Sequence, residues 1–121
     1  MKFYRCKKCN NLIIKLNEGP CTPACCGETM DLLEPCSTDA SVEKHVPVLA
    51  EKDGWYMVYV GTNAHPMTEE HYIEWVLAEY ENRFEVLRLK PGEEPKVMLS
   101  SEEKPVAVYA YCNLHGLWRN E

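Results

Sequence analysis

Apolar and polar residues alternate along most of the chain with the period of two that is typical of β-strands. Runs of branched and aromatic residues are separated by turn sequences such as Asp53-Gly54 and Pro91-Gly92. Short strands at such spacing predict a mainly β fold, with the larger part of the chain built as a β-sandwich. We predict these strands over residues 46–51, 55–60, 84–89, 96–99 and 106–111.

Residues 68–80 fit two patterns. Thr68 followed by two acidic residues is typical of a helix start. Read with a period of two, the same segment places alternate apolar side chains from Ile73 onward on one face of a strand. We predict a strand preceded by a brief helical turn near Pro66, because another strand-like run follows at Phe84.

The first part of the chain predicts a small metal-binding module. Two short strands, at residues 2–5 and 11–16, surround a Cys-x-x-Cys motif, and an adjacent cysteine pair follows. The segment holds few large apolar side chains, and modules below about 40 residues normally need a metal or a disulfide to fold. Residues 34–40 have the composition of a linker, so we divide the chain into domains of residues 1–36 and 37–121.

Net charge and cysteine content limit the partners and the cellular compartment that we expect for this protein. The 121-residue chain has a formal net charge of -6, which argues against a nucleic-acid partner. No apolar run approaches the roughly 18 residues of a membrane span, and no signal-peptide core is present, so we expect a cytoplasmic protein without a membrane partner. Seven cysteines, four of them in close pairs, favour metal binding over disulfides in a reducing compartment.

Two cysteine pairs make the first candidate metal site. Four thiolates from two tight turns suit a tetrahedral iron or zinc ion, and a purely structural zinc knuckle is the alternative. The remaining cysteines of this region, Cys21 and Cys36, are interpreted as free thiols. The predicted ligands are Cys6, Cys9, Cys25 and Cys26.

All four histidines and one further cysteine make the second candidate site. Four imidazoles exceed what tetrahedral zinc requires, and a single thiolate favours a redox metal. Five donors also leave the sixth position of an octahedral ion open, so we predict a redox iron centre, with zinc or copper as minor alternatives. The predicted ligands are His45, His65, His71, Cys112 and His115.

These motifs, in their order, resemble the two-iron desulfoferrodoxin type of superoxide reductase over nearly the whole chain. The resemblance is carried by the two cysteine pairs and by four further segments. These are Glu43-Lys44-His45-Val46-Pro47, His65-Pro66-Met67, Glu70-His71-Tyr72-Ile73 and Cys112-Asn113-Leu114-His115-Gly116-Leu117-Trp118.

The resemblance implies a fold, two cofactors and a reaction. The expected fold is a rubredoxin-like or desulforedoxin-like module followed by an immunoglobulin-like, neelaredoxin-like β-sandwich. The expected cofactors are two irons per chain, one on four cysteines and one with the four histidines in a plane and Cys112 axial. The implied reaction is the one-electron reduction of superoxide to hydrogen peroxide. An external donor such as rubredoxin would then re-reduce the iron, and relatives form homodimers.

Two residues beside the first histidine receive catalytic roles from the same resemblance. Lys44 is expected to attract the superoxide anion, and Glu43 is expected to bind the open position of the ferric iron. The main alternative is a non-catalytic iron electron-transfer protein with both sites closed. A zinc-stabilised binding module is a second alternative from another class.

Overall fold

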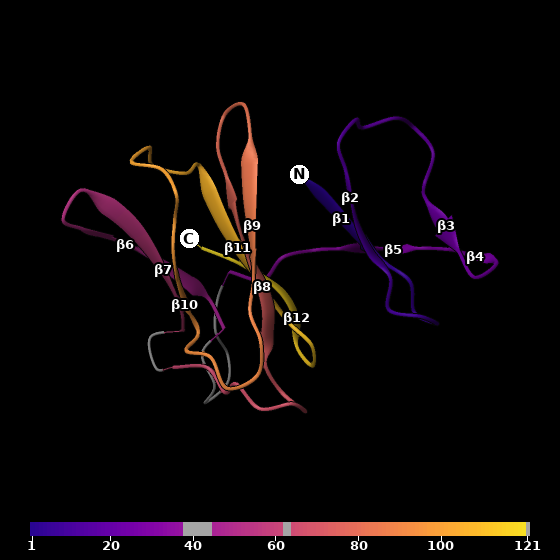
Figure 1. Ribbon diagram of the computed structural model, residues 1–121. Coiled ribbons are helices and arrows are strands. Elements are labelled where there is room, and N and C mark those ends of the chain that lie inside the picture. The colour runs from indigo at the N-terminus through magenta and orange to yellow at the C-terminus, as the bar shows by residue number, and fades with distance from the viewer. Residues whose placement is uncertain (38–44, 62–63, 121) are drawn as a thin grey trace. The chain divides into compact units, whose positions relative to one another are not determined.

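The computed structural model describes residues 1–37, 45–61 and 64–120 (Figure 1). The chain divides into two compact units, Met1–Glu34 and Pro35–Glu121. Every regular element in the described ranges is a β-strand, which confirms the mainly β prediction.

The first unit consists of a small sheet and a short hairpin. The sheet has the strand order β2-β1-β5, with β1 at Lys2–Arg5, β2 at Leu12–Lys15 and β5 at Asp31–Leu33. The hairpin pairs β3 (Ala24–Cys25) with β4 (Glu28–Thr29). A cluster of three buried residues, Tyr4, Cys6 and Met30, packs together in this unit with Ile13 and Cys25 against it, a core too small to stabilise a domain without help.

The turn of that hairpin separates the two adjacent cysteines. Cys26 and Gly27 both have left-handed backbone angles, with φ of 52° and 77°. Positive φ at both central residues of a two-residue loop is the geometry of a type I′ turn. Cys25 therefore ends a strand while Cys26 occupies the turn.

The second unit is a sandwich of two antiparallel sheets. One sheet has the order β10-β7-β6 and the other β12-β11-β8-β9. The first contains β6 (Pro47–Lys52), β7 (Trp55–Val60) and β10 (Lys96–Met98). The second contains β8 (Ile73–Glu79), β9 (Phe84–Arg88), β11 (Ala107–Cys112) and β12 (Gly116–Arg119).

Side chains from both sheets form one core between them. Val58 and Val60 of β7 pack in the same cluster as Val76 of β8 and Val108 of β11. Every residue of β11 is buried, so this strand runs through the middle of the unit and carries Cys112, which is fully buried, at its end. The core thus fixes one of the predicted metal-ligating side chains directly.

The ambiguous segment is a strand, as predicted, but it is not preceded by a helical turn. Pro66 and Met67 have no regular structure, and residues 68–71 form bends. The prediction of a brief helix there is therefore wrong. A tight turn replaces it, in which the backbones of Thr68 and His71 exchange N–H···O bonds of 2.9 and 3.2 Å.

A β-bulge lies where β8 approaches the end of β11. Tyr111 pairs with Trp75, whereas Cys112 pairs with Ile73, so Glu74 is the extra residue. Bulges commonly redirect a strand beside a functional site. Here the bulge redirects the segment that leads back from Ile73 to His71.

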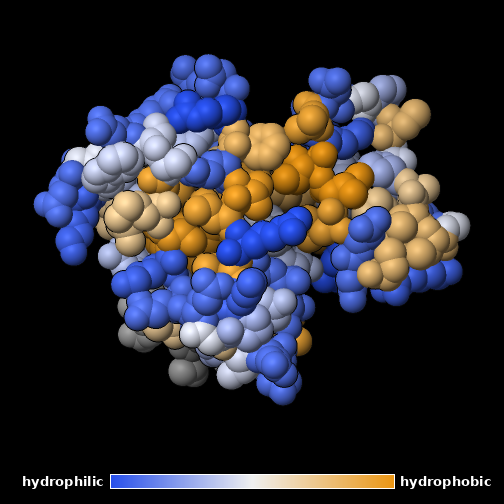
Figure 2. Space-filling model, viewed as in Figure 1, coloured by the Kyte–Doolittle hydropathy of each residue, from blue (hydrophilic) through white to orange (hydrophobic). Residues whose placement is uncertain are grey.

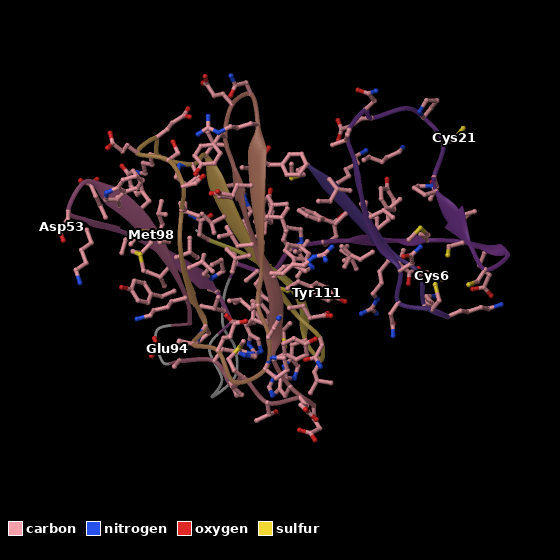
Figure 3. All side chains as sticks on the ribbon, in the orientation of Figure 1. Cys6, Cys21, Asp53, Glu94, Met98 and Tyr111 are labelled. Atoms are coloured by element: carbon pink, nitrogen blue, oxygen red, sulfur yellow. The ribbon has the colours of Figure 1, made fainter. Side chains whose placement is uncertain are left out.

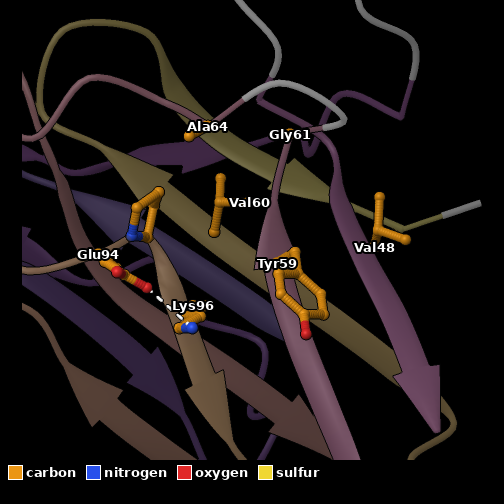
Figure 4. Close-up of a pocket in the computed structure, with 8 residues that line it drawn as sticks. Val48, Tyr59, Val60, Gly61, Ala64, Glu94 and Lys96 are labelled. Atoms are coloured by element: carbon orange, nitrogen blue, oxygen red, sulfur yellow. Dashed lines mark ion pairs between the residues drawn. The ribbon is translucent and has the colours of Figure 1, made fainter. Parts of the chain in front are cut away.

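The surface of the second unit includes apolar side chains. Figure 2 shows them gathered over its strands, and Met98 and Val86 are among the exposed ones. A hollow of about 590 Å³ lies at the end of β7, lined by Val48 and Tyr59 and by the Glu94–Lys96 ion pair (Figure 4). No helix in the described part of the chain is long and apolar enough to cross a membrane.

Candidate metal centres

The four predicted cysteines of the first unit come together around one point. Their sulfur atoms all lie within 4.8 Å of one another. The Cys25 sulfur is 3.6 Å from that of Cys9 and 3.9 Å from that of Cys26. Figure 3 shows sulfur atoms grouped near Cys6, with Cys21 away from them in the connection that follows β2.

Backbone hydrogen bonds build the first half of this site. The Asn10 amide donates to the Cys6 carbonyl at 2.9 Å, and the Cys6 amide donates to the Asn11 carbonyl at 2.8 Å. Asn10 has a φ of 63°, which lets the chain turn sharply after Cys9. Cys6 and Cys9 consequently face the hairpin that carries the other two thiols.

The thiols influence each other's ionisation. The Cys9 backbone amide, which donates to the Cys6 sulfur, lowers the pKa of Cys6 to about 7. Hydrogen bonding with the side chains of Cys9 and then Cys6 raises the pKa of Cys26 to about 12. Four such thiols do not ionise together unless a cation compensates their charge, which is the behaviour of a thiolate metal site.

Asn11 is a contact that sequence reasoning missed. Its Nδ2 atom lies 3.9 Å from the Cys25 sulfur. An asparagine two positions after a Cys-x-x-Cys motif was the available signal. Cys21 and Cys36 lie outside the cluster. Cys36 belongs to the second unit, where its backbone forms an isolated parallel β-bridge with that of Trp118.

The second site gathers donors from distant segments of the sandwich. One ligand atom from each of His45, His65, His71 and Cys112 lies within 4.8 Å of the others. His115 lies outside this tightest group but joins it through Nδ1, which is 3.0 Å from the His45 Nε2 atom and 3.9 Å from the Cys112 sulfur. All five predicted donors therefore surround one point.

Neighbouring groups fix the orientation of the imidazoles. The Nδ1 atom of His65 lies 2.7 Å from the Pro66 carbonyl oxygen, which only accepts hydrogen bonds. Nδ1 therefore carries the proton, which leaves the lone pair on Nε2, as in many metal-binding histidines. Trp118 stacks on His45 with a centroid distance of 4.6 Å and donates from Nε1 to the His115 carbonyl at 3.1 Å.

The burial of this cluster agrees with a bound cation. His45 and His65 are each 2% exposed and Cys112 is fully buried. Withdrawing polar groups from water is costly unless they are compensated. A donor set of imidazoles and one thiolate fits a redox transition metal, whereas tetrahedral zinc needs only four donors.

The two predicted catalytic residues, Glu43 and Lys44, lie outside the described residues. Trp75 and Tyr111, which flank the ligands in sequence, stack on each other at 5.5 Å. Asn113, within the predicted motif, had no role assigned to it, although its side chain bonds to Glu70 and Tyr72, the two neighbours of His71.

Comparison with known proteins gives concordant results. The family model described as Desulfoferrodoxin matches residues 37–121. The chain is 41% identical to a desulfoferrodoxin homolog of Archaeoglobus fulgidus over 99% of this chain and 96% of that protein. It is 40% identical to the desulfoferrodoxin of Desulfarculus baarsii over 100% of this chain and 96% of that protein.

A solved structure has the same overall fold. The crystal structure of the superoxide reductase from Treponema pallidum superimposes with a TM-score of 0.82 at 28% sequence identity. The match covers 99% of this chain and 97% of that one, so it includes both units.

Proposed function

The chain belongs to the desulfoferrodoxin family, and from this premise we propose that it is a superoxide reductase. Superoxide, one electron and two protons give hydrogen peroxide. The observation that carries the proposal is the convergence of four imidazoles and one thiol on a single point of the second unit.

The five donors would hold an iron ion that supplies one-electron redox chemistry when bound, and they would leave one coordination position for superoxide. Cys112 would contribute electron density through its thiolate, as cysteine does at other iron centres. The four histidines would surround the metal, and Trp118 and Pro66 keep two of those rings in place. The buried end of β11 keeps the thiolate away from water.

The first unit would hold a second iron on Cys6, Cys9, Cys25 and Cys26. With so small a core, this unit depends on its metal to fold. The same iron is suited to one-electron transfer, because four thiolates bind both of its common oxidation states.

Two side chains next to His45 would act on the substrate. Lys44 would attract superoxide, opposing the field of a chain with a net charge of -6. Glu43 would occupy the open position in the ferric state and withdraw from the ferrous one. The support for both roles is their place in the sequence, directly before His45, which belongs to the cluster of possible metal ligands.

The electron donor, assembly and compartment complete the proposal. Rubredoxin or a similar small iron protein would re-reduce the site. A homodimer is supported by the exposed apolar side chains of β6, β7 and β10, among them Val48, Tyr59 and Met98. Four cysteines arranged as metal ligands favour a reducing compartment, the cytoplasm.

Two other functions make different predictions. A non-catalytic electron carrier would have both irons closed, so azide, cyanide and nitric oxide would leave the spectrum of the histidine-rich iron unchanged. A zinc-stabilised binding module would be colourless and would contain zinc at both sites.

Pulse radiolysis of the reduced, iron-loaded protein tests the reaction directly. A reductase gives one hydrogen peroxide for each superoxide consumed. Half that yield would indicate dismutation and would overturn the proposal, as would the absence of any reaction.

A further inference from the structure

Two of the segments that carry predicted ligands of the second site are joined by one side chain. His71 lies in the segment before β8, whereas Cys112 and His115 lie at the end of β11 and in the turn that follows it. Asn113 directly follows Cys112 in the chain. Its side chain bonds to the residues on both sides of His71.

The contacts of Asn113 bracket His71. The Oδ1 atom accepts a hydrogen bond of 3.0 Å from the Tyr72 amide, and the Nδ2 atom donates to the Glu70 carbonyl at 3.0 Å. The Asn113 backbone amide also donates to the Tyr72 carbonyl at 3.2 Å. Three bonds therefore connect the residue beside Cys112 to the two neighbours of His71.

The Asn113 side chain continues the hydrogen bonding between the two segments where the β-ladder of β8 and β11 ends. Cys112 pairs with Ile73 as the last residue pair of β11 and β8. Beyond it, the Tyr72 amide bonds to a side-chain oxygen in place of a strand carbonyl. This arrangement prolongs the contact between the two segments while the Asn113 backbone turns toward His115.

Other hydrogen bonds of the His71 loop lie within the loop or run to the connection after β9. Thr68 bonds to His71 within the loop itself, through its backbone and through Oγ1 at 3.1 Å. The Met67 carbonyl accepts a bond from Gly92, in the connection after β9. These bonds fix the shape of the loop, whereas those of Asn113 tie it to the strand end that carries Cys112.

We propose that Asn113 is a positioning residue that locks the His71 loop to the Cys112–His115 turn, so that the three donors of these two segments are in register before the metal binds. The inference rests on the proposed iron site. Residues that orient metal ligands typically change metal affinity by about 10-fold to 100-fold when they are replaced.

The experiment compares Asn113→Ala with Asn113→Asp and with Asn120→Ala in the full-length protein. Asn120 is a matched control, because its Oδ1 atom also accepts a backbone hydrogen bond, 2.8 Å from Val108, at the opposite end of β11. Asn113→Asp keeps the acceptor for Tyr72 but loses the donor to Glu70. It also remains informative if the alanine variant does not fold.

Three readouts are measured for each protein: ferrous-iron affinity by chelator competition, the thiolate-to-iron charge-transfer band after oxidation, and hydrogen exchange of the His71 and Tyr72 amides without metal. We expect Asn113→Ala to weaken iron binding by about 10-fold or more, shift the band and speed exchange, with Asn113→Asp intermediate. Asn120→Ala should leave the affinity and the band as in the wild type.

The outcomes separate the inference from the proposed function. If the wild type binds iron with a thiolate band and the Asn113 variants match it, the positioning role is overturned and the function stands. Equal losses in Asn113→Ala and Asn120→Ala would also overturn the role, because general destabilisation would then explain both. If the wild type itself binds no iron at this site, the proposed function fails.

Discussion

The Nε2 atom of His45 lies 3.0 Å from the Nδ1 atom of His115, although 70 positions separate the two residues in the chain. The two rings meet edge to face, with centroids 4.8 Å apart. One imidazole thus points at the site through Nε2 and the other through Nδ1. Such mixed use of ring nitrogens would let His45, just before β6, and His115, in the turn after β11, bind the same ion.

Replacement of the buried thiol tests the second site most simply. Cys112→Ser substitutes a hydroxyl that is a much weaker ligand for a redox metal. We expect loss of the thiolate-to-iron band and at least about tenfold weaker iron binding, measured by absorbance and chelator competition. Cys36→Ser, which changes an exposed thiol of the same unit, is the control and should bind iron normally. An intact band in Cys112→Ser would remove the cysteine from the ligand set.

Removal of one positive charge tests substrate attraction. Lys44→Ala should slow the second-order reaction with superoxide by about tenfold at low ionic strength and flatten its salt dependence. Lys52→Ala removes an equal charge at the far end of β6 and should change the rate little. The rates are measured by pulse radiolysis across ionic strength. Equal rates for Lys44→Ala and the wild type at every salt concentration would refute the role.

The acidic neighbour of Lys44 is tested by spectroscopy. Glu43→Ala should shift the ferric charge-transfer band or allow added azide to bind, because a carboxylate would no longer occupy the open position. Glu81→Ala, in the turn between β8 and β9, is a control that loses the same charge. Identical ferric spectra in Glu43→Ala and the wild type, with and without azide, would count against ligation.

Substitution of Gly27 tests whether the turn of the β3–β4 hairpin, which separates Cys25 from Cys26, supports metal binding. Gly27 has a φ of 77°, so an alanine there is strained by about 1 kcal/mol even though space is open around it. Gly27→Ala should therefore release metal from the four-cysteine site about fivefold more readily. Gly19→Ala, which also meets open space but lacks a left-handed φ, should be neutral. Equal metal retention in both variants would show that the turn does not limit binding.

Metal binding by the first unit should depend on pH. Cys26, with its pKa near 12, is protonated at neutral pH, so its proton must be released to solvent when the metal binds. Affinity should consequently rise by about tenfold per pH unit for each proton released. Below pH 7 the dependence should steepen, because Cys6, with its pKa near 7, is then protonated too. Cobalt titration of the metal-free protein at several pH values measures this slope, and a pH-independent affinity would contradict the prediction.

The strands were predictable wherever one face is buried. The alternation at β7 and the apolar run at β11 indicated their strands directly, because these residues face the core. β12 was not predicted, since Gly116 begins it and its four residues were interpreted only as part of a metal motif. The strands β3 and β4 have only two residues each, and their hairpin depends on the type I′ turn at Cys26 and Gly27.

The metal donors were predictable from residue type and spacing, but their support was not. The chain has only four histidines and seven cysteines, so the short motifs that contain them can be recognised directly as metal-ligand candidates. The contacts of Asn113 depend on a β-bulge at Glu74, and the stacking of Trp118 on His45 depends on β12 lying beside that ring. Both are tertiary relationships between segments that are far apart in the sequence.

The most direct test of the central claim is a crystal structure of the iron-loaded protein with anomalous data at the iron edge. We predict one iron in the second unit bonded to the nitrogens of His45, His65, His71 and His115 and to the Cys112 sulfur, with the sixth position free of protein ligands in the reduced state. A reduced structure in which any of these five donors lies beyond bonding distance, or in which a further side chain closes the sixth position, would contradict it.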